Sequence, residues 1–125
     1  MLRRLAILAL MVGGCSASPT TSPMAPWIPI RVEGSGIMNT APFQLEAGDY
    51  IISWSAADRS TGDRVGCSHG ATLRPVSGKG GELLVNAGVE ADGMKSGVTH
   101  VYGAIAGSYY IRASSGCNWQ FEISR

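Results

Sequence analysis

The sequence predicts an all-β domain, an antiparallel two-sheet β-sandwich of jelly-roll-like type, and three observations predict it. Seventeen glycines in 125 residues indicate many turns. Short segments that alternate apolar and polar residues recur between glycine, proline and polar breaks. After residue 27, no apolar stripe follows the 3.6-residue period of an amphipathic helix. The hydrophobic content of 45% and charged content of 15% are typical of a globular chain.

Eight segments have the character of strands, and we expect seven or eight strands to form. They are residues 28–32, 42–45, 50–56, 71–76, 82–85, 98–104, 109–113 and 117–123. Pro29 restricts the first segment to the edge of a sheet, because proline has no N–H to donate. Residues 57–70 and 86–97 are polar and are expected to be loops.

The last two segments alternate most regularly and are expected to form a hairpin. Because strand side chains alternate between faces, one set should point inward: Tyr109, Ile111, Trp119 and Phe121. The other set should point outward: Tyr110, Arg112, Gln120 and Glu122.

The first fourteen residues have the layout of a secretory signal peptide. Residues 1–4 include Arg3 and Arg4 and form a short positive segment, and residues 5–12 are an apolar run. About eight apolar residues are too few for a bilayer span, which needs ~20. We therefore interpret this segment as an export signal.

The run Val12-Gly13-Gly14-Cys15 resembles the bacterial lipobox, in which small residues precede an obligatory cysteine. The resemblance implies a diacylglyceryl thioether on Cys15, cleavage before it, and attachment to a lipid membrane through several acyl chains. Two alternatives remain open: cleavage after Ala17, which would release a soluble protein, and a signal that is not cleaved. The predicted organisation is a signal peptide (1–14), the lipidated cysteine with a Pro/Ser/Thr-rich tether (15–26) and a β-sandwich domain (27–125).

Once Cys15 is lipidated, Cys67 and Cys117 remain as an even pair in an oxidising compartment. Neither belongs to a CxxC motif, and no His/Cys cluster has the spacing of zinc ligands. We therefore expect a Cys67–Cys117 disulfide rather than a reactive thiol.

The charge balance argues against nucleic acid as a partner. The whole chain has ten Lys+Arg and nine Asp+Glu, and loss of Arg3 and Arg4 with the signal leaves eight against nine, a net charge of −1. A near-neutral domain without a basic stripe lacks the electrostatic footprint of a nucleic-acid-binding protein.

No residues in the sequence form a recognisable catalytic or cofactor motif, and no cofactor or metal is predicted. His69 and His100 are far apart, His69 within a Gly66–Gly70 loop and His100 within a strand, and nothing nominates a third ligand. Asp58 and Asp63 share a loop but lack the alternating oxygen spacing of calcium loops, so a solvated turn is the better interpretation.

The remaining candidate site is a pair of outward residues, Tyr110 and Arg112. A tyrosine beside an arginine on a sandwich face can stack on a sugar ring or on a partner protein. The alternative is ordinary surface, since scattered exposed aromatics are common. Trp27, at the end of the tether, is expected to pack on the domain or to meet lipid headgroups.

Several core and turn positions resemble small β-sandwich domains of bacterial envelope lipoproteins. They include Pro42-Phe43, Ala47-Gly48-Asp49-Tyr50, Trp54, Cys67, Tyr109-Tyr110-Ile111 and Gly116-Cys117-x-Trp119, and the resemblance covers about residues 30–125. It implies a non-catalytic domain of structural or carbohydrate-binding-like role, and it assigns no functional residue.

These observations predict an envelope-anchored lipoprotein that faces the periplasm or the exterior and acts by binding or structure. Two more specific alternatives remain open: a carbohydrate-binding module for cell-surface glycans, and a phage- or plasmid-type surface lipoprotein that blocks a protein partner. An enzyme is the third class.

Overall fold

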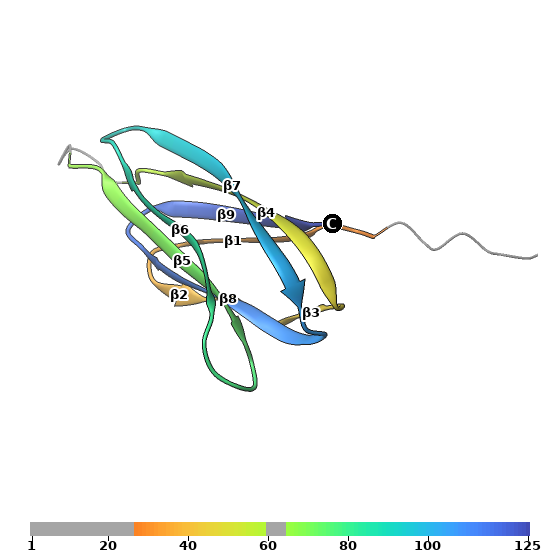
Figure 1. Ribbon diagram of the computed structural model, residues 1–125. Helices are drawn as coiled ribbons and strands as arrows, with labels where there is room; N and C mark the ends of the chain where they lie inside the picture. Colours follow the sequence, from red (N-terminus) through yellow and green to blue (C-terminus); the bar gives the residue numbers. More distant parts are fainter. Residues whose placement is uncertain (1–26, 60–64) are drawn as a thin grey trace, which may run out of the picture.

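The computed structural model describes residues 27–59 and 65–125, which form two β-sheets packed face to face (Figure 1). The strands are β1 (Ile30–Ser35), β2 (Met38–Asn39), β3 (Phe43–Leu45), β4 (Gly48–Ala57), β5 (Cys67–Pro75), β6 (Glu82–Val89), β7 (Met94–Ala104), β8 (Gly107–Ser115) and β9 (Asn118–Ser124). Within these ranges no helix is long and apolar enough to span a bilayer. The predicted signal peptide, Cys15, the tether and Asp63 lie outside the described residues.

The strand order is that of a jelly roll. One sheet, the β1–β7 sheet, has the order β1-β9-β4-β7, and the other, the β2–β6 sheet, has the order β2-β8-β5-β6 with β3 also paired to β8. All the pairings are antiparallel. Because β2 and β3 lie along the same strand β8, they act as two pieces of one interrupted strand, which leaves two four-stranded layers. The predicted fold class is confirmed.

The core lies between the two sheets and is made by alternate residues of each strand. From β9 it takes Trp119, Phe121 and Ile123, and from β8 it takes Ile111 and Ala113. Trp119 is 3% exposed, while Ile111 and Phe121 are fully buried, so the predicted register of the final hairpin holds. Arg112 and Gln120 are exposed as expected, whereas Tyr109, Tyr110 and Glu122 are half-buried.

The expected loop over residues 86–97 is wrong: β6 continues to Val89 and β7 begins at Met94. The polar residues of this stretch belong to strands with one face in solvent, as antiparallel sheets allow. Gly97 serves packing rather than a turn, because a Cβ atom there would lie 2.7 Å from the Trp54 ring. The expected loop over 57–70 is also too long, since Ala57 ends β4 and Cys67 begins β5.

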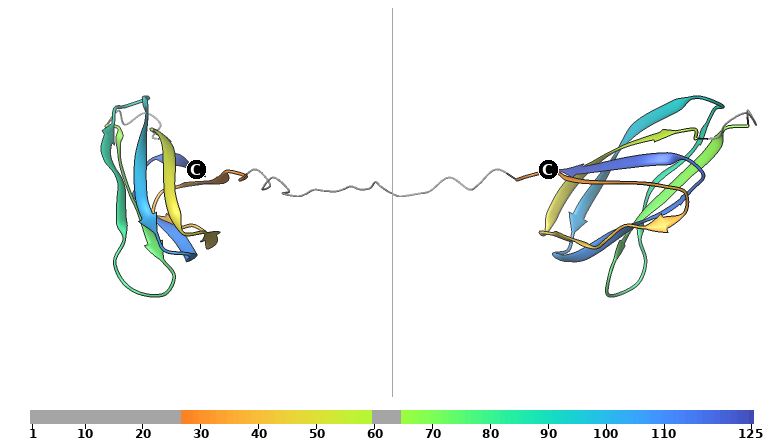
Figure 2. Two further views of the ribbon diagram at one scale, coloured as in Figure 1. Left: turned by 45° about the vertical axis from the view of Figure 1, so that its right-hand side comes forward. Right: turned by 180° about the vertical axis from the view of Figure 1, so that it is seen from behind.

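The first strand of the domain lies at the edge of its sheet, as Pro29 predicts. Strand β1 lies at the end of its sheet and pairs with β9 alone, from Ile30↔Ile123 to Ser35↔Asn118. Just before it, the Trp27 ring packs against Tyr50 with ring centroids 5.6 Å apart. The described chain therefore begins in contact with the core and continues into β1 along the strand axis (Figure 2).

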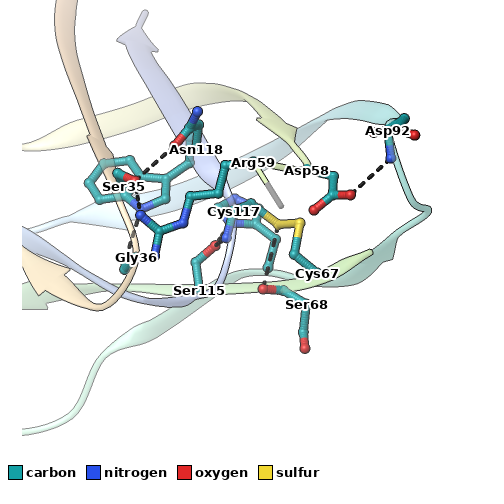
Figure 3. The surroundings of a disulfide bond; sticks show 12 residues. Ser35, Gly36, Asp58, Arg59, Cys67, Ser68, Asp92, Ser115, Cys117 and Asn118 are labelled. Atoms are coloured by element: carbon teal, nitrogen blue, oxygen red, sulfur yellow. Dashed lines mark hydrogen bonds between the residues drawn. A yellow bond between two sulfur atoms is a disulfide. The ribbon is translucent and has the colours of Figure 1, made fainter. Parts of the chain in front are cut away.

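The predicted disulfide is present, with 5.5 Å between the Cα atoms of Cys67 and Cys117. It joins the first residue of β5 in one sheet to the turn before β9 in the other, at the end of the sandwich opposite to residue 27 (Figures 1 and 3). At the same end, the Asp58 carboxylate accepts a 2.8 Å hydrogen bond from the Asp92 N–H. Asp92 has a positive φ of 56°, a conformation that aspartate adopts more readily than most residues.

We expect the purified, exported chain to show no free thiol at Cys67 or Cys117 when unfolded without reductant. Its reduction should cost about 4 kcal/mol in the chain-entropy model, because the bridge closes a loop over 50 residues. In a Cys15→Ser background, reduction of the bridge should lower the melting temperature by roughly 4–8 °C for each kcal/mol of unfolding free energy lost. A Cys67→Ser/Cys117→Ser double variant with an unchanged melting temperature would contradict this expectation.

Candidate functional site

The outward face of the β2–β6 sheet carries both residues predicted as a ligand site. Tyr110 and Arg112 lie on β8, and the register pairs Tyr110 with Arg74 and Arg112 with Thr72 on β5. Side chains directly opposite on neighbouring strands are in contact range. The structure therefore adds Arg74 to the predicted pair, and we call Arg74, Tyr110 and Arg112 the arginine face.

Both guanidinium groups are held over the sheet by neutral acceptors. Arg74 Nε donates to Thr72 Oγ1 at 3.0 Å, which draws Arg74 toward the residue opposite Arg112. Arg112 Nη1 donates to Asn39 Oδ1 at 3.1 Å. In residues 27–59 and 65–125 the ion pairs are Arg31–Glu122 and Arg125–Glu46, so neither arginine of the face is ion-paired there.

A shallow hollow of about 210 Å³ adjoins the two arginines. It forms at Gly70, which has no side chain and lies on the outward side of β5. Its lining residues are Gly70, Ala71, Thr72, Arg74, Leu83, Val85, Asn86, Arg112 and Ser114. Leu83 is 63% exposed and Asn86 is also exposed, so the hollow presents both an apolar wall and hydrogen-bonding groups to solvent.

The described strands of this sheet present no carboxylate on their outward side, and Glu90, just past the end of β6, lines a separate hollow with Ser68 and Gly88. Alternation from the buried residues places these side chains outward: Asn39, Gln44, Ser68, Thr72, Arg74, Leu83, Asn86, Ser108, Tyr110, Arg112 and Ser114. Glu82 pairs with the buried Leu73, so its side chain leaves the strand on the opposite side of the sheet. The outer face of the β1–β7 sheet differs, because Glu122 lies there and binds Arg31 at 3.2 Å.

His69 is not a loop residue, which corrects the prediction from its glycine neighbours. It lies in β5, fully buried, with its ring between those of Trp54 (centroids 5.4 Å apart) and Phe121 (5.6 Å). Its Nδ1 is 2.9 Å from Ser115 Oγ, and that oxygen accepts a 3.0 Å hydrogen bond from the Cys117 N–H. Its Nε2 has no hydrogen-bond partner among the described residues. Burial lowers the pKa of His69 below its ordinary value.

The other candidates do not converge on a metal. His100 lies exposed on β7, where its ring stacks on Tyr102 at 5.9 Å between centroids, away from the buried His69. Asp58 caps the turn at Asp92, which is a structural contact. No group of three or more His, Cys, Asp or Glu suited to a metal occurs in the part of the chain that the structure describes.

Sequence reasoning missed Arg74, Gly70 and Leu83 as members of the site. The alternation of residues 71–76 does place Thr72 and Arg74 on one face. What the sequence does not contain is the pairing of β5 with β8, which brings Arg74 beside Tyr110. Leu83 faces outward because the register shifts between Ala71 and Thr72, a β-bulge that no residue pattern announces.

Comparison with known proteins adds little to this geometry. No protein-family model matches the chain, and no curated protein matches it. Among solved structures, the chain is similar to a carbohydrate-binding module of lichenase 5A from Cellvibrio mixtus, in complex with cellotriose. The identity is 17% and the TM-score 0.39, over 76% of this chain and 70% of that one. A likeness this distant carries no argument about function.

The buried His69 should make stability depend on pH. Its folded pKa is lowered while the unfolded pKa is near 6.5, so the unfolded state binds a proton first as pH falls. The stability that neutral His69 contributes is therefore complete above about pH 6.5 and is lost below it, by at most about 1.4 kcal/mol per pH unit.

Urea melts between about pH 7.5 and 5.5 measure this slope. A His69→Gln variant should have a flatter pH dependence than the wild type, since Gln does not titrate. His100→Gln is the matched control, because His100 is exposed, and it should keep the wild-type slope. An identical slope in His69→Gln would show that this histidine titrates alike in both states.

Proposed function

We propose that the chain is an exported lipoprotein, anchored in a membrane of the cell envelope through acylated Cys15, whose sandwich is a non-catalytic binding domain. The signal layout of residues 1–12 and the lipobox-like Val12-Gly13-Gly14-Cys15 support the anchor. The Pro/Ser/Thr-rich residues 16–26 support a spacer between lipid and domain.

The proposed ligand is a cell-surface glycan bound at the arginine face. One observation carries this proposal: Arg74, Tyr110 and Arg112 lie on one face of neighbouring strands beside a hollow. A tyrosine ring offers an apolar platform to a sugar ring. The guanidinium groups, Thr72 and Asn86 offer hydrogen bonds to its oxygens.

A second candidate function is the binding of an envelope protein along β7. This strand is the edge of the β1–β7 sheet, and its outward row includes Met94, Val98 and Tyr102, which are 75%, 57% and 73% exposed. An apolar row on an edge strand is typical of a protein-docking surface. Binding that is lost in Val98→Lys and kept in Tyr110→Ala would favour this candidate over the glycan.

The anchor is tested by substitution of the lipobox cysteine. Cys15→Ser should move the protein from the membrane fraction to the precursor or soluble fraction, because no thioether can form. Mass spectrometry of the wild type should find an acylated N-terminus at Cys15. A mature, unmodified chain that begins at Ser18 would contradict the anchor and favour cleavage after Ala17.

Glycan binding is tested on an array of bacterial surface polysaccharides with the detergent-solubilised chain. Tyr110→Ala should lower the affinity for the glycan by about 2- to 12-fold, equivalent to the 0.5–1.5 kcal/mol of a ring contact. Its stability should change by less than about 1 kcal/mol in urea melts.

Tyr102→Ala is the matched control, since it removes an exposed tyrosine from the opposite sheet. It should leave glycan affinity unchanged. Equal loss in both variants would place the ligand elsewhere, and absence of any glycan binding would refute the proposed ligand class.

A further inference from the structure

We infer that the arginine face selects anionic glycans, polysaccharides that carry carboxylate or phosphate groups. The juxtaposition that carries the inference is Arg74 and Arg112 lining one hollow together with Thr72, with Tyr110 directly opposite Arg74, on strands that present no described carboxylate on this face. It deepens the proposed function, on which it rests, by naming the class of ligand.

Arg74 and Arg112 are diagonal neighbours on adjacent strands and both line the same hollow. Arg112 lies directly opposite Thr72, and Arg74 donates a hydrogen bond to that same threonine. Two positive groups on adjacent strands repel each other when no counter-charge lies between them. A bound anion would relieve this repulsion, which favours a charged ligand over a neutral one.

Both side chains keep donors for a ligand. A guanidinium has five N–H groups, and the hydrogen bonds here use Nε of Arg74 and Nη1 of Arg112. Their acceptors are a hydroxyl and an amide oxygen, which orient the groups without neutralising them. The remaining N–H groups match the paired oxygens of a carboxylate or phosphate.

Arg74 and Arg112 are the cations on the described strands of the β2–β6 sheet, and the other described cations lie elsewhere. On the β1–β7 sheet Arg31 is already bound to Glu122, and at the sheet's end Arg125 is bound to Glu46 at 2.8 Å. The predicted mature chain has a net charge of −1, so it repels a polyanion weakly overall. Arg59, Lys79 and Lys95 have no ion pair among the described residues either, but they lie outside the strands of the β2–β6 sheet, so the positive groups beside the hollow are Arg74 and Arg112.

Tyr110 argues for a sugar polymer rather than a free anion. It lies directly opposite Arg74, so a sugar ring stacked on Tyr110 would place its acidic substituent within reach of a guanidinium. The hollow at Gly70, with the exposed Leu83 wall, gives the neighbouring sugar a recess.

The test compares immobilised polygalacturonate (carboxylate), a phosphodiester-linked polysaccharide and neutral amylose, each against the detergent-solubilised full chain. Binding to one or both acidic polymers should exceed binding to amylose and weaken as salt rises. The preferred acidic polymer identifies which anion the ligand carries. Equally tight binding of single-stranded DNA would overturn selection of glycans and reveal charge attraction alone.

Three substitutions locate the effect. Arg112→Gln and Arg74→Gln should each lower the affinity for the acidic polymer by about tenfold, as expected for loss of a charge-assisted hydrogen bond. Arg31→Gln is the matched control, an exposed arginine on the other sheet, and should bind like the wild type. Thermal melts confirm that each variant folds.

The outcomes separate this inference from the proposed function. Amylose bound as tightly as the acidic polymers, with no effect of either arginine variant and a loss in Tyr110→Ala, would overturn anion selection and leave glycan binding intact. No binding to any of the three polymers, and none to the wider array, would overturn both.

Discussion

The packing of strand β9 against the core is the interaction on which the rest of the sandwich depends. It lies between β1 and β4 in its sheet and contributes Trp119, Phe121 and Ile123 to the core. Trp119 also donates a 3.0 Å hydrogen bond to the Gly36 carbonyl, which fixes the turn between β1 and β2. The disulfide at Cys117 then ties the start of β9 to β5. Strand β9 thus joins the edge strand β1 to the central strand β4, and the cysteine just before it joins the two sheets.

The buried residues that stabilise β5 and β8 lie apart from the solvent-facing residues of the candidate ligand site. The bridge, His69 and Ser115 form a continuous buried cluster beneath the end of the sandwich that lies away from residue 27. This cluster anchors β5 and β8 at one end. Further along these two strands, Thr72, Arg74, Tyr110 and Arg112 face solvent. The candidate ligand face is therefore built on two strands that this buried cluster ties down at one end, which suits a preformed site.

The sequence predicted what local alternation and counting can determine. The final hairpin was recognised because both of its strands alternate, and the bridge because two cysteines remained after Cys15. Strands β6 and β7 were cut short because Asn86, Gly88 and Gly97 look like loop residues, although the first two face solvent and Gly97 makes room for Trp54. His69 was misplaced for the same reason. Arg74 lies in the site because β5 pairs with β8, and no local pattern in the sequence encodes that pairing.

The position of β1 has a mechanical consequence under the N-terminal anchor that we propose. Residues 27–29 continue in line with β1, so tension applied there acts along the strand axis (Figure 2). Six registered residue pairs join β1 to β9, and an axial load stretches them together in shear instead of opening them one at a time. The load passes from β9 into β4 and, through the covalent Cys67–Cys117 link, into the second sheet. The weakly paired edge strand is thus oriented to bear force in its strongest direction.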